Sequence, residues 1–171
     1  TEDTEDAEVR DKVFANLKLF LPGKWSGLRQ SPELNRAIDK LLARPAGRAT
    51  GLALIGAAGK TDKVAEVARL ARSKDEAGPV RQAAIRTLGA LPSAASARAL
   101  EGLLRAEPTA LRPEVVQALG RLAKQKRGSP GAAAALETLQ GLVRGKGSDP
   151  AARRSALGAL ADTRPGTAWV L

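Results

Sequence analysis

The chain has 171 residues, of which 43% are hydrophobic but only 2% aromatic, and a formal net charge of +10. It contains no cysteine, which excludes disulfides and thiol catalysis, and no histidine, which excludes a Ser–His–Asp triad and the commonest metal ligand. The core must be built from Ala, Leu, Val and Ile, and because residues that favour strands are scarce, the composition predicts an all-α fold.

The N-terminal segment differs in charge from the remainder of the chain. Residues 1–11 hold six acids and one arginine, a net charge of −5, whereas the remaining residues carry +15. A basic body suggests an acidic partner. Residues 3–20 carry apolar residues at helical spacing, which predicts an additional N-terminal helix that caps the following structure. The apolar residues are Val9, Val13, Leu17 and Phe20.

From residue 31 onward, Pro- and Gly-rich turn signals separate Ala- and Leu-rich segments that are predicted to be helices. Capping residues mark four of the starts, namely Ser31, Asp62, Ser93 and Asp149. The segments also repeat. Residues 80–91 align with 47–58 at an offset of 33 and with 111–122 at an offset of 31. Each is preceded by another amphipathic helix, so the repeating unit is a helical pair. The preceding helices are 32–44, 62–73, 93–106 and 131–145.

The tetrapeptide Leu-Gly-Ala-Leu occurs at 88–91 and again at 157–160, which gives a literal offset of 69. An offset of 72 loses the identity but keeps apolar residues aligned with apolar residues. We prefer 72, because the buried stripe requires an apolar side chain at each of its positions. This is a stronger guide to the alignment than the identity of four consecutive residues.

The second helix of the best-conforming pair reads VRQAAIRTLG over residues 80–89 and resembles the HEAT-like helical repeats over about residues 31–171. The resemblance implies a right-handed α–α superhelix of about four helical pairs with an extra N-terminal helix. The units are about 31–60, 61–92, 93–128 and 129–166, preceded by an acidic segment and capping helix over 1–30, and we expect one continuous domain. The composition, rich in Ala, Arg, Gly and Pro, is similar to that of HEAT segments in large modular planctomycete-type proteins.

An arginine begins the second helix of each pair. It lies in line with the buried stripe, so we expect its stem to pack there while the guanidinium reaches a carbonyl or the next repeat. This favours a structural role over ligand binding. The Asp that usually precedes this Arg by two residues in the family is absent, so the Asp–Arg ladder is in doubt. The structural column is Arg48, Arg81, Arg112 and Arg153.

The face opposite the buried stripe is predicted to line a shallow groove with few charges, which suits a peptide or a helix better than a phosphate backbone. In the first unit it comprises Thr50, Ala53, Leu54 and Ala57, and in the next Ala83, Arg86, Thr87 and Ala90. In the last two units it comprises Glu114, Gln117, Ala118 and Arg121, and Ser155, Gly158, Ala159 and Asp162.

Basic residues concentrate at helix ends, where they offset the helix dipole and form a candidate binding patch. The predicted patch is Arg121, Lys124, Lys126, Arg127, Arg144 and Lys146. The two tryptophans, Trp25 and Trp169, are interpreted as packing residues.

Catalysis has little support. Asp62 and Glu66 share a helix face but have bases nearby, and residues 56–61, GAAGKT, lack the spacing of a phosphate-binding loop. We therefore expect a non-enzymatic interaction or spacer scaffold, without cofactor or metal, that is monomeric and has no membrane span. Its partner would be a protein or peptide, with an acidic one as a candidate, or neighbouring domains of a parent chain. The alternative is a nucleic-acid-binding solenoid that uses the basic helix ends.

Overall fold

The computed structural model describes the backbone of residues 2–106, 111–125, 128–145 and 149–163. Within these ranges the chain forms α-helices and short 3-10 turns and no strand, which confirms the predicted all-α class. Contacts divide the chain into two compact units, residues 1–60 and 61–171. The expectation of one continuous domain stays a prediction.

The first unit contains α1 (Glu2–Phe20), α2 (Pro32–Ala43) and α3 (Arg48–Ala58), and both α1 and α2 pack on α3. Ser31 caps α2, because its hydroxyl accepts a hydrogen bond from the backbone N–H of Leu34 at 3.1 Å. Gly59 ends α3 in the left-handed conformation at φ +66°, which glycine adopts without strain. The buried core comprises Leu21, Leu34, Ile38, Leu42, Leu52, Leu54 and Ile55.

The predicted N-terminal helix is present, but part of its apolar stripe is not covered. Val9 is 60% exposed and Val13 is 49% exposed, whereas Phe20 is half-buried. Phe20 packs against Trp25 with ring centroids 5.0 Å apart, so Trp25 makes a packing contact, as expected. Trp169 lies outside the described residues.

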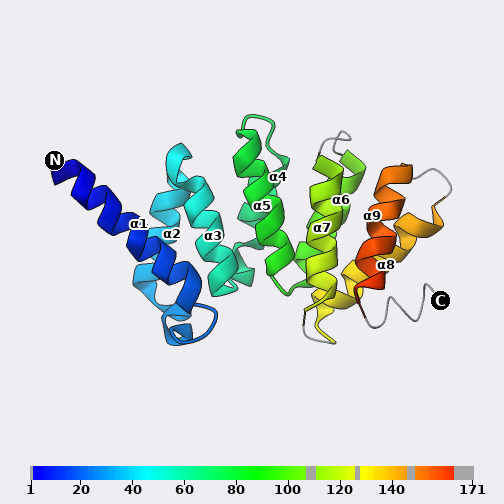
Figure 1. Cartoon of the computed structure of the whole chain (residues 1–171), viewed down its shortest axis with the longest axis horizontal. Coiled ribbons are helices and arrows are strands. Elements are labelled where there is room, and N and C mark those ends of the chain that lie inside the picture. Colours follow the sequence, from blue (N-terminus) through cyan, green and yellow to red (C-terminus); the bar gives the residue numbers. More distant parts are fainter. Residues whose placement is uncertain (1, 107–110, 126–127, 146–148, 164–171) are drawn as a thin grey trace. The chain divides into compact units, whose positions relative to one another are not determined.

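Within the described residues of the second unit, six α-helices pack in two layers (Figure 1). The first helices of the pairs form one layer, in which α6 contacts α4 and α8, and the second helices form the other, in which α7 contacts α5 and α9. The first helices are α4 (Val64–Arg72), α6 (Ala94–Ala106) and α8 (Pro130–Arg144). The second helices are α5 (Gly78–Ala90), α7 (Arg112–Ala123) and α9 (Pro150–Ala161).

Three of the four predicted caps lie where they were expected. Besides Ser31, the Asp149 carboxylate accepts a hydrogen bond from Ala151 N at 3.2 Å before α9. Ser129, which was not among the predicted caps, accepts from Ala132 N at 3.3 Å before α8. Ser93 accepts from Ser96 N at 3.1 Å. The prediction for Asp62 was wrong, because α4 begins at Val64 after a 3-10 turn that includes Asp62.

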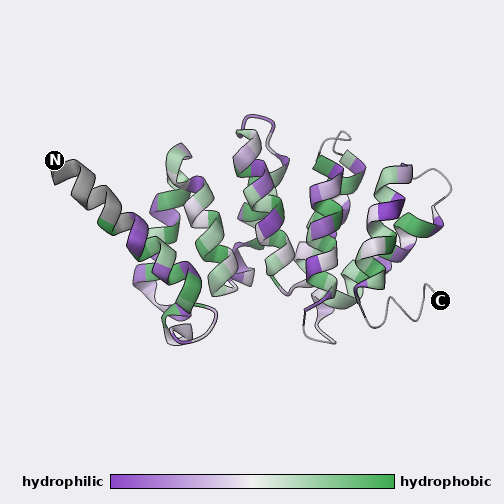
Figure 2. Ribbon diagram, in the orientation of Figure 1, coloured by the Kyte–Doolittle hydropathy of each residue, from purple (hydrophilic) through white to green (hydrophobic). Residues whose placement is uncertain are grey.

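The core of the second unit lies between its two layers and is built from aliphatic side chains, as the composition predicts. Hydrophobic and hydrophilic residues alternate around each helix, so that each presents faces of both kinds (Figure 2). Fully buried side chains include Leu70, Ile85, Leu88, Leu100, Leu103, Leu119, Leu139 and Leu160.

Close contacts between neighbouring second helices identify the register of the repeat. A Cβ atom placed on Gly89 of α5 would lie 2.8–3.0 Å from backbone and side-chain atoms of Ala118 on α7. A Cβ atom on Gly120 of α7 would lie 3.0 Å from the Cβ of Ala159 on α9. The same contact therefore recurs with Gly120 in the place of Gly89 and Ala159 in the place of Ala118. Steps of 31 and 41 residues add up to the offset of 72 rather than 69.

Candidate functional site

Two members of the arginine column join the two helices of their pair. The Arg48 Nε donates to the carbonyl of Leu42 at 3.1 Å, and the Arg81 Nε donates to the carbonyl of Ala71 at 3.1 Å. Each acceptor is the penultimate residue of the preceding helix, α2 or α4, where backbone carbonyls lack a partner within the helix. The guanidinium thus satisfies the end of the first helix from the start of the second.

The two later members of the column differ. The Arg112 Nε is buried and has no hydrogen-bond partner among the described residues, and Arg153 is exposed on α9. The carbonyl contact therefore occurs for Arg48 and Arg81 and is not seen for Arg112 or Arg153.

The outer surface of the second helices carries two adjacent furrows, and we refer to it as the α5/α7/α9 face. The first furrow, of about 190 Å³, lies between α5 and α7. Its walls carry two arginines and one glutamate, and one carboxylate oxygen of Glu114 is buried with no hydrogen-bond partner among the described residues. The furrow is lined by Gln82, Arg86, Glu114, Gln117 and Arg121.

The second furrow, of about 360 Å³, lies between α7 and α9 and shares Gln117 and Arg121 with the first. Its floor consists of small residues, and a Cβ on Gly158 would meet no atom within 4 Å. At one end the Lys124 ammonium donates to the Asp162 carboxylate at 2.8 Å, a pair exposed to solvent. The remaining lining residues are Gly120, Ser155 and Ala159.

The sequence predicted most of the residues that line the two furrows. Three other residues that it placed on the same exposed face were assigned wrongly. Leu54, Thr87 and Ala118 are buried rather than exposed, at 0%, 5% and 1%. A second helix in this fold packs on neighbouring second helices as well as on its own first helix, so its buried surface is wider than a single stripe. In the second unit this lateral contact covers Ala118, which lies against Gly89.

A larger groove of about 610 Å³ lies between α6 and α8, in the layer of first helices. Arg98 and Glu101 line the α6 side, Glu137 lines the α8 side, and Glu101 is paired with Arg105. The opposite charges balance, so this groove offers no excess of either sign.

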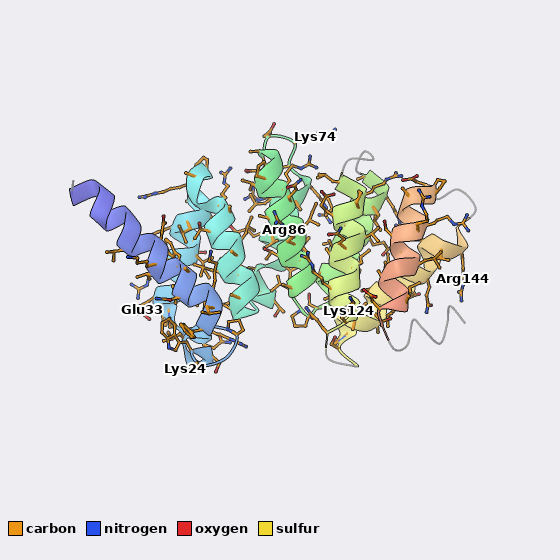
Figure 3. All side chains as sticks on the ribbon, viewed as in Figure 1. Lys24, Glu33, Lys74, Arg86, Lys124 and Arg144 are labelled. Carbon is orange, nitrogen blue, oxygen red and sulfur yellow. The ribbon has the colours of Figure 1, made fainter. Side chains whose placement is uncertain are left out.

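The three described residues of the predicted basic patch belong to the ends of two different helices. Arg121 and Lys124 lie in and just after the last turn of α7, whereas Arg144 ends α8 (Figure 3). Because α8 starts after the end of α7 and is 15 residues long, its last residue lies roughly 22 Å from its start. Lys126, Arg127 and Lys146 lie outside the described residues.

Gln125 makes a contact between helices that the sequence did not indicate. Its amide nitrogen donates to the carbonyls of Gly89 at 3.2 Å and Ala90 at 2.9 Å, which lie at the end of α5. The glutamine therefore joins the ends of two neighbouring second helices, which are 35 residues apart in the sequence.

Neither of the chemical motifs considered in the sequence acquires a supporting geometry. Glu66 pairs with Lys63 at 3.4 Å, and the GAAGKT segment contains the end of α3 and its Gly59 cap. Among the described residues there is no group of three or more acidic side chains able to hold a metal ion. Likewise, none of the described helices is both long and apolar enough to cross a membrane.

Comparison with known proteins agrees with this architecture. Residues 34–120, half of the chain, match the HEAT repeats. Neither a curated protein nor a solved structure matches the chain. HEAT repeats generally form non-catalytic scaffolds and commonly mediate protein–protein interactions. From the helical pairs, the repeated close contacts and this match, we conclude that the chain belongs to the HEAT-repeat family.

Proposed function

We propose that this chain is a non-catalytic interaction module that binds a protein segment on the α5/α7/α9 face. The segment would belong to another protein or to a neighbouring domain of a parent chain. The observation that carries the proposal is the pair of furrows that share Gln117 and Arg121. A helix or an extended segment that follows both furrows would contact three successive helices at once.

The chemistry of the face suits a peptide. The small floor of the α7/α9 furrow lets a bulky side chain approach the backbone closely, and the polar walls offer donors and acceptors for a main chain. Arg86 and Arg121 provide charge at the α5/α7 furrow, where Glu114 is the only acid among the lining residues. This small excess of positive charge favours a segment with some acidic residues.

The test uses peptides selected from a displayed random library against the whole chain. Gly158→Leu places a side chain in the open space of the α7/α9 furrow and favours the helix, since leucine is a better helix former than glycine. We expect the selected peptides to bind this variant at least tenfold more weakly than they bind the native chain.

Gly141→Leu is the matched control. Gly141 lines the α6/α8 groove, and a Cβ there also meets no atom within 4 Å. The control should retain affinity for the selected peptides. If Gly141→Leu abolishes binding and Gly158→Leu does not, the binding face lies in the layer of first helices and the proposal is wrong.

The nucleic-acid alternative stays a prediction. Of the predicted patch, Lys124 is neutralised by Asp162, and Arg144 ends a different helix, so no specific observation favours it over a peptide.

A further inference from the structure

The ends of the first helices α4, α6 and α8 and the starts of the second helices α5, α7 and α9 lie along one edge of the second unit (Figure 1). The first helices α4, α6 and α8 lie side by side, and each ends where its own connector begins. Lys74, in the connector from α4 to α5, lies on this edge, whereas Lys124 lies on the opposite one (Figure 3).

Each of these connectors begins and ends with an arginine, one in the last turn of the first helix and one in the first turn of the second. We call this set the arginine edge. Successive pairs of these arginines are some thirty to forty residues apart, so no short stretch of the sequence contains more than one pair of them. The arginine edge comprises Arg72, Arg81, Arg105, Arg112, Arg144 and Arg153.

The arginine edge is accessible and carries an excess of positive charge. Four of its members, Arg72, Arg105, Arg144 and Arg153, are exposed. Over the three connectors, residues 72–81, 105–112 and 144–153, the sequence contains eight bases and four acids, a net charge of +4. Arg105 also pairs with Glu101 in the preceding turn of α6, which lowers the excess to +3. Helix C-termini attract bases, but this accounts only for the arginines that end the first helices.

The spacing of the edge indicates what would bind it. Neighbouring packed helices lie about 8–10 Å apart, so equivalent arginines of successive pairs are separated by about that distance. An extended peptide in the polyproline II conformation has three residues per turn and rises about 3.1 Å per residue, which places every third side chain on the same face at intervals of about 9 Å. Duplex DNA carries one charge per about 1.7 Å of its axis and is a poorer match. No aromatic residue occurs in the three connectors to stack on unpaired bases.

We propose that the arginine edge binds an extended acidic segment of a partner protein with a carboxylate at about every third residue. Guanidinium groups pair with carboxylates through parallel hydrogen bonds, which suits this kind of ligand. This surface is separate from the α5/α7/α9 face, and its failure would leave the peptide-binding proposal intact.

Binding is measured with a labelled 15-residue peptide of five Glu-Ser-Ser repeats at low salt. A peptide of identical composition with its five glutamates contiguous is the control for spacing. We expect the repeating peptide to bind several-fold more tightly than the clustered one, and both to weaken strongly in 0.5 M salt. No binding of the repeating peptide at 50 mM salt, or equal binding of both peptides, would overturn the proposal.

The triple variant R72Q/R105Q/R153Q removes one exposed arginine from each connector. It should weaken binding of the repeating peptide by about tenfold, because three exposed charge contacts are lost together. Thermal unfolding monitored by circular dichroism verifies that the variant is folded.

The matched control K18Q/R36Q/R98Q removes the same charge from exposed helix positions that belong neither to the connectors nor to the α5/α7/α9 face. It should change affinity less than twofold. Equal losses in both triple variants would show that only net charge matters and that the edge is not a site. If a 20-base-pair duplex, but not the peptide, loses affinity in the edge variant, the edge is a nucleic-acid surface and the partner class is wrong.

Discussion

Gly89→Ala should destabilise the chain, although alanine is the better helix former. The added Cβ would lie 2.8 Å from the carbonyl oxygen and 2.9 Å from the Cα of Ala118. Both are backbone atoms, so relief requires α5 and α7 to move apart. Overpacking of this kind costs about 1–3 kcal/mol, and the gain in helix propensity offsets about 1 kcal/mol. Because two backbone atoms must move, we expect the overpacking term to dominate and the free energy of unfolding to fall by about 1–2 kcal/mol.

Gly158→Ala provides the internal comparison, because its added Cβ meets no atom within 4 Å. It should gain about 1 kcal/mol from helix propensity alone. For a chain of this length, 1 kcal/mol moves the melting temperature by about 2–4 °C. Thermal unfolding followed by circular dichroism should therefore show a fall of about 2–8 °C for Gly89→Ala and a rise of about 2–4 °C for Gly158→Ala. If Gly89→Ala raises the melting temperature as much as Gly158→Ala, the close approach of α5 and α7 is refuted.

Three further contacts are tested by the same unfolding measurement. Arg81→Met should lower stability by about 1–2 kcal/mol because it removes the hydrogen bond to the end of α4. Arg153→Met, for which the described part of the chain shows no such contact, should be near neutral, and equal effects of the two variants would contradict the role assigned to Arg81. Lys124→Ala should cost less than about 0.5 kcal/mol because its pair with Asp162 is exposed, and a larger loss would mean that this bridge holds α7 to α9. Gln125→Ala should cost about 1 kcal/mol through the lost bonds to two carbonyls, and a silent variant would show that these bonds contribute nothing.

The sequence predicted the elements of the fold well because the signals are local. Ser31 and Asp149 precede prolines at helix starts, and each determines its boundary through contacts within three residues. Asp62 fails for a local reason too, since a 3-10 turn at Thr61–Lys63 delays the start of α4.

The sequence pattern did not predict the lateral packing of neighbouring second helices. A periodicity of 3.6 residues predicts one buried stripe, but Ala118 is also buried on a second side, where it lies against Gly89 of α5. Such burial depends on residues that lie some thirty positions away, as in the contact of Gly89 with Ala118. A small residue at both partners is the signal that would have indicated this contact.

The candidate site was predicted in part for the same reason. Gln117, Arg121 and Asp162 were placed on one face by their helical positions, and they line the furrows. The arginine edge was not recognised, because its members come together only when successive pairs stack. The column of Arg81 and its equivalents contains half of the edge, and the other half lies at the ends of the preceding helices.

A titration of the isotope-labelled chain with a selected peptide, followed by NMR, tests the central proposal most directly. Chemical-shift changes and intermolecular contacts should concentrate in residues 117–124 and 155–162, on the walls of the α7/α9 furrow. Changes confined to residues 98–105 and 137–142, on the walls of the α6/α8 groove, would contradict the proposed binding face.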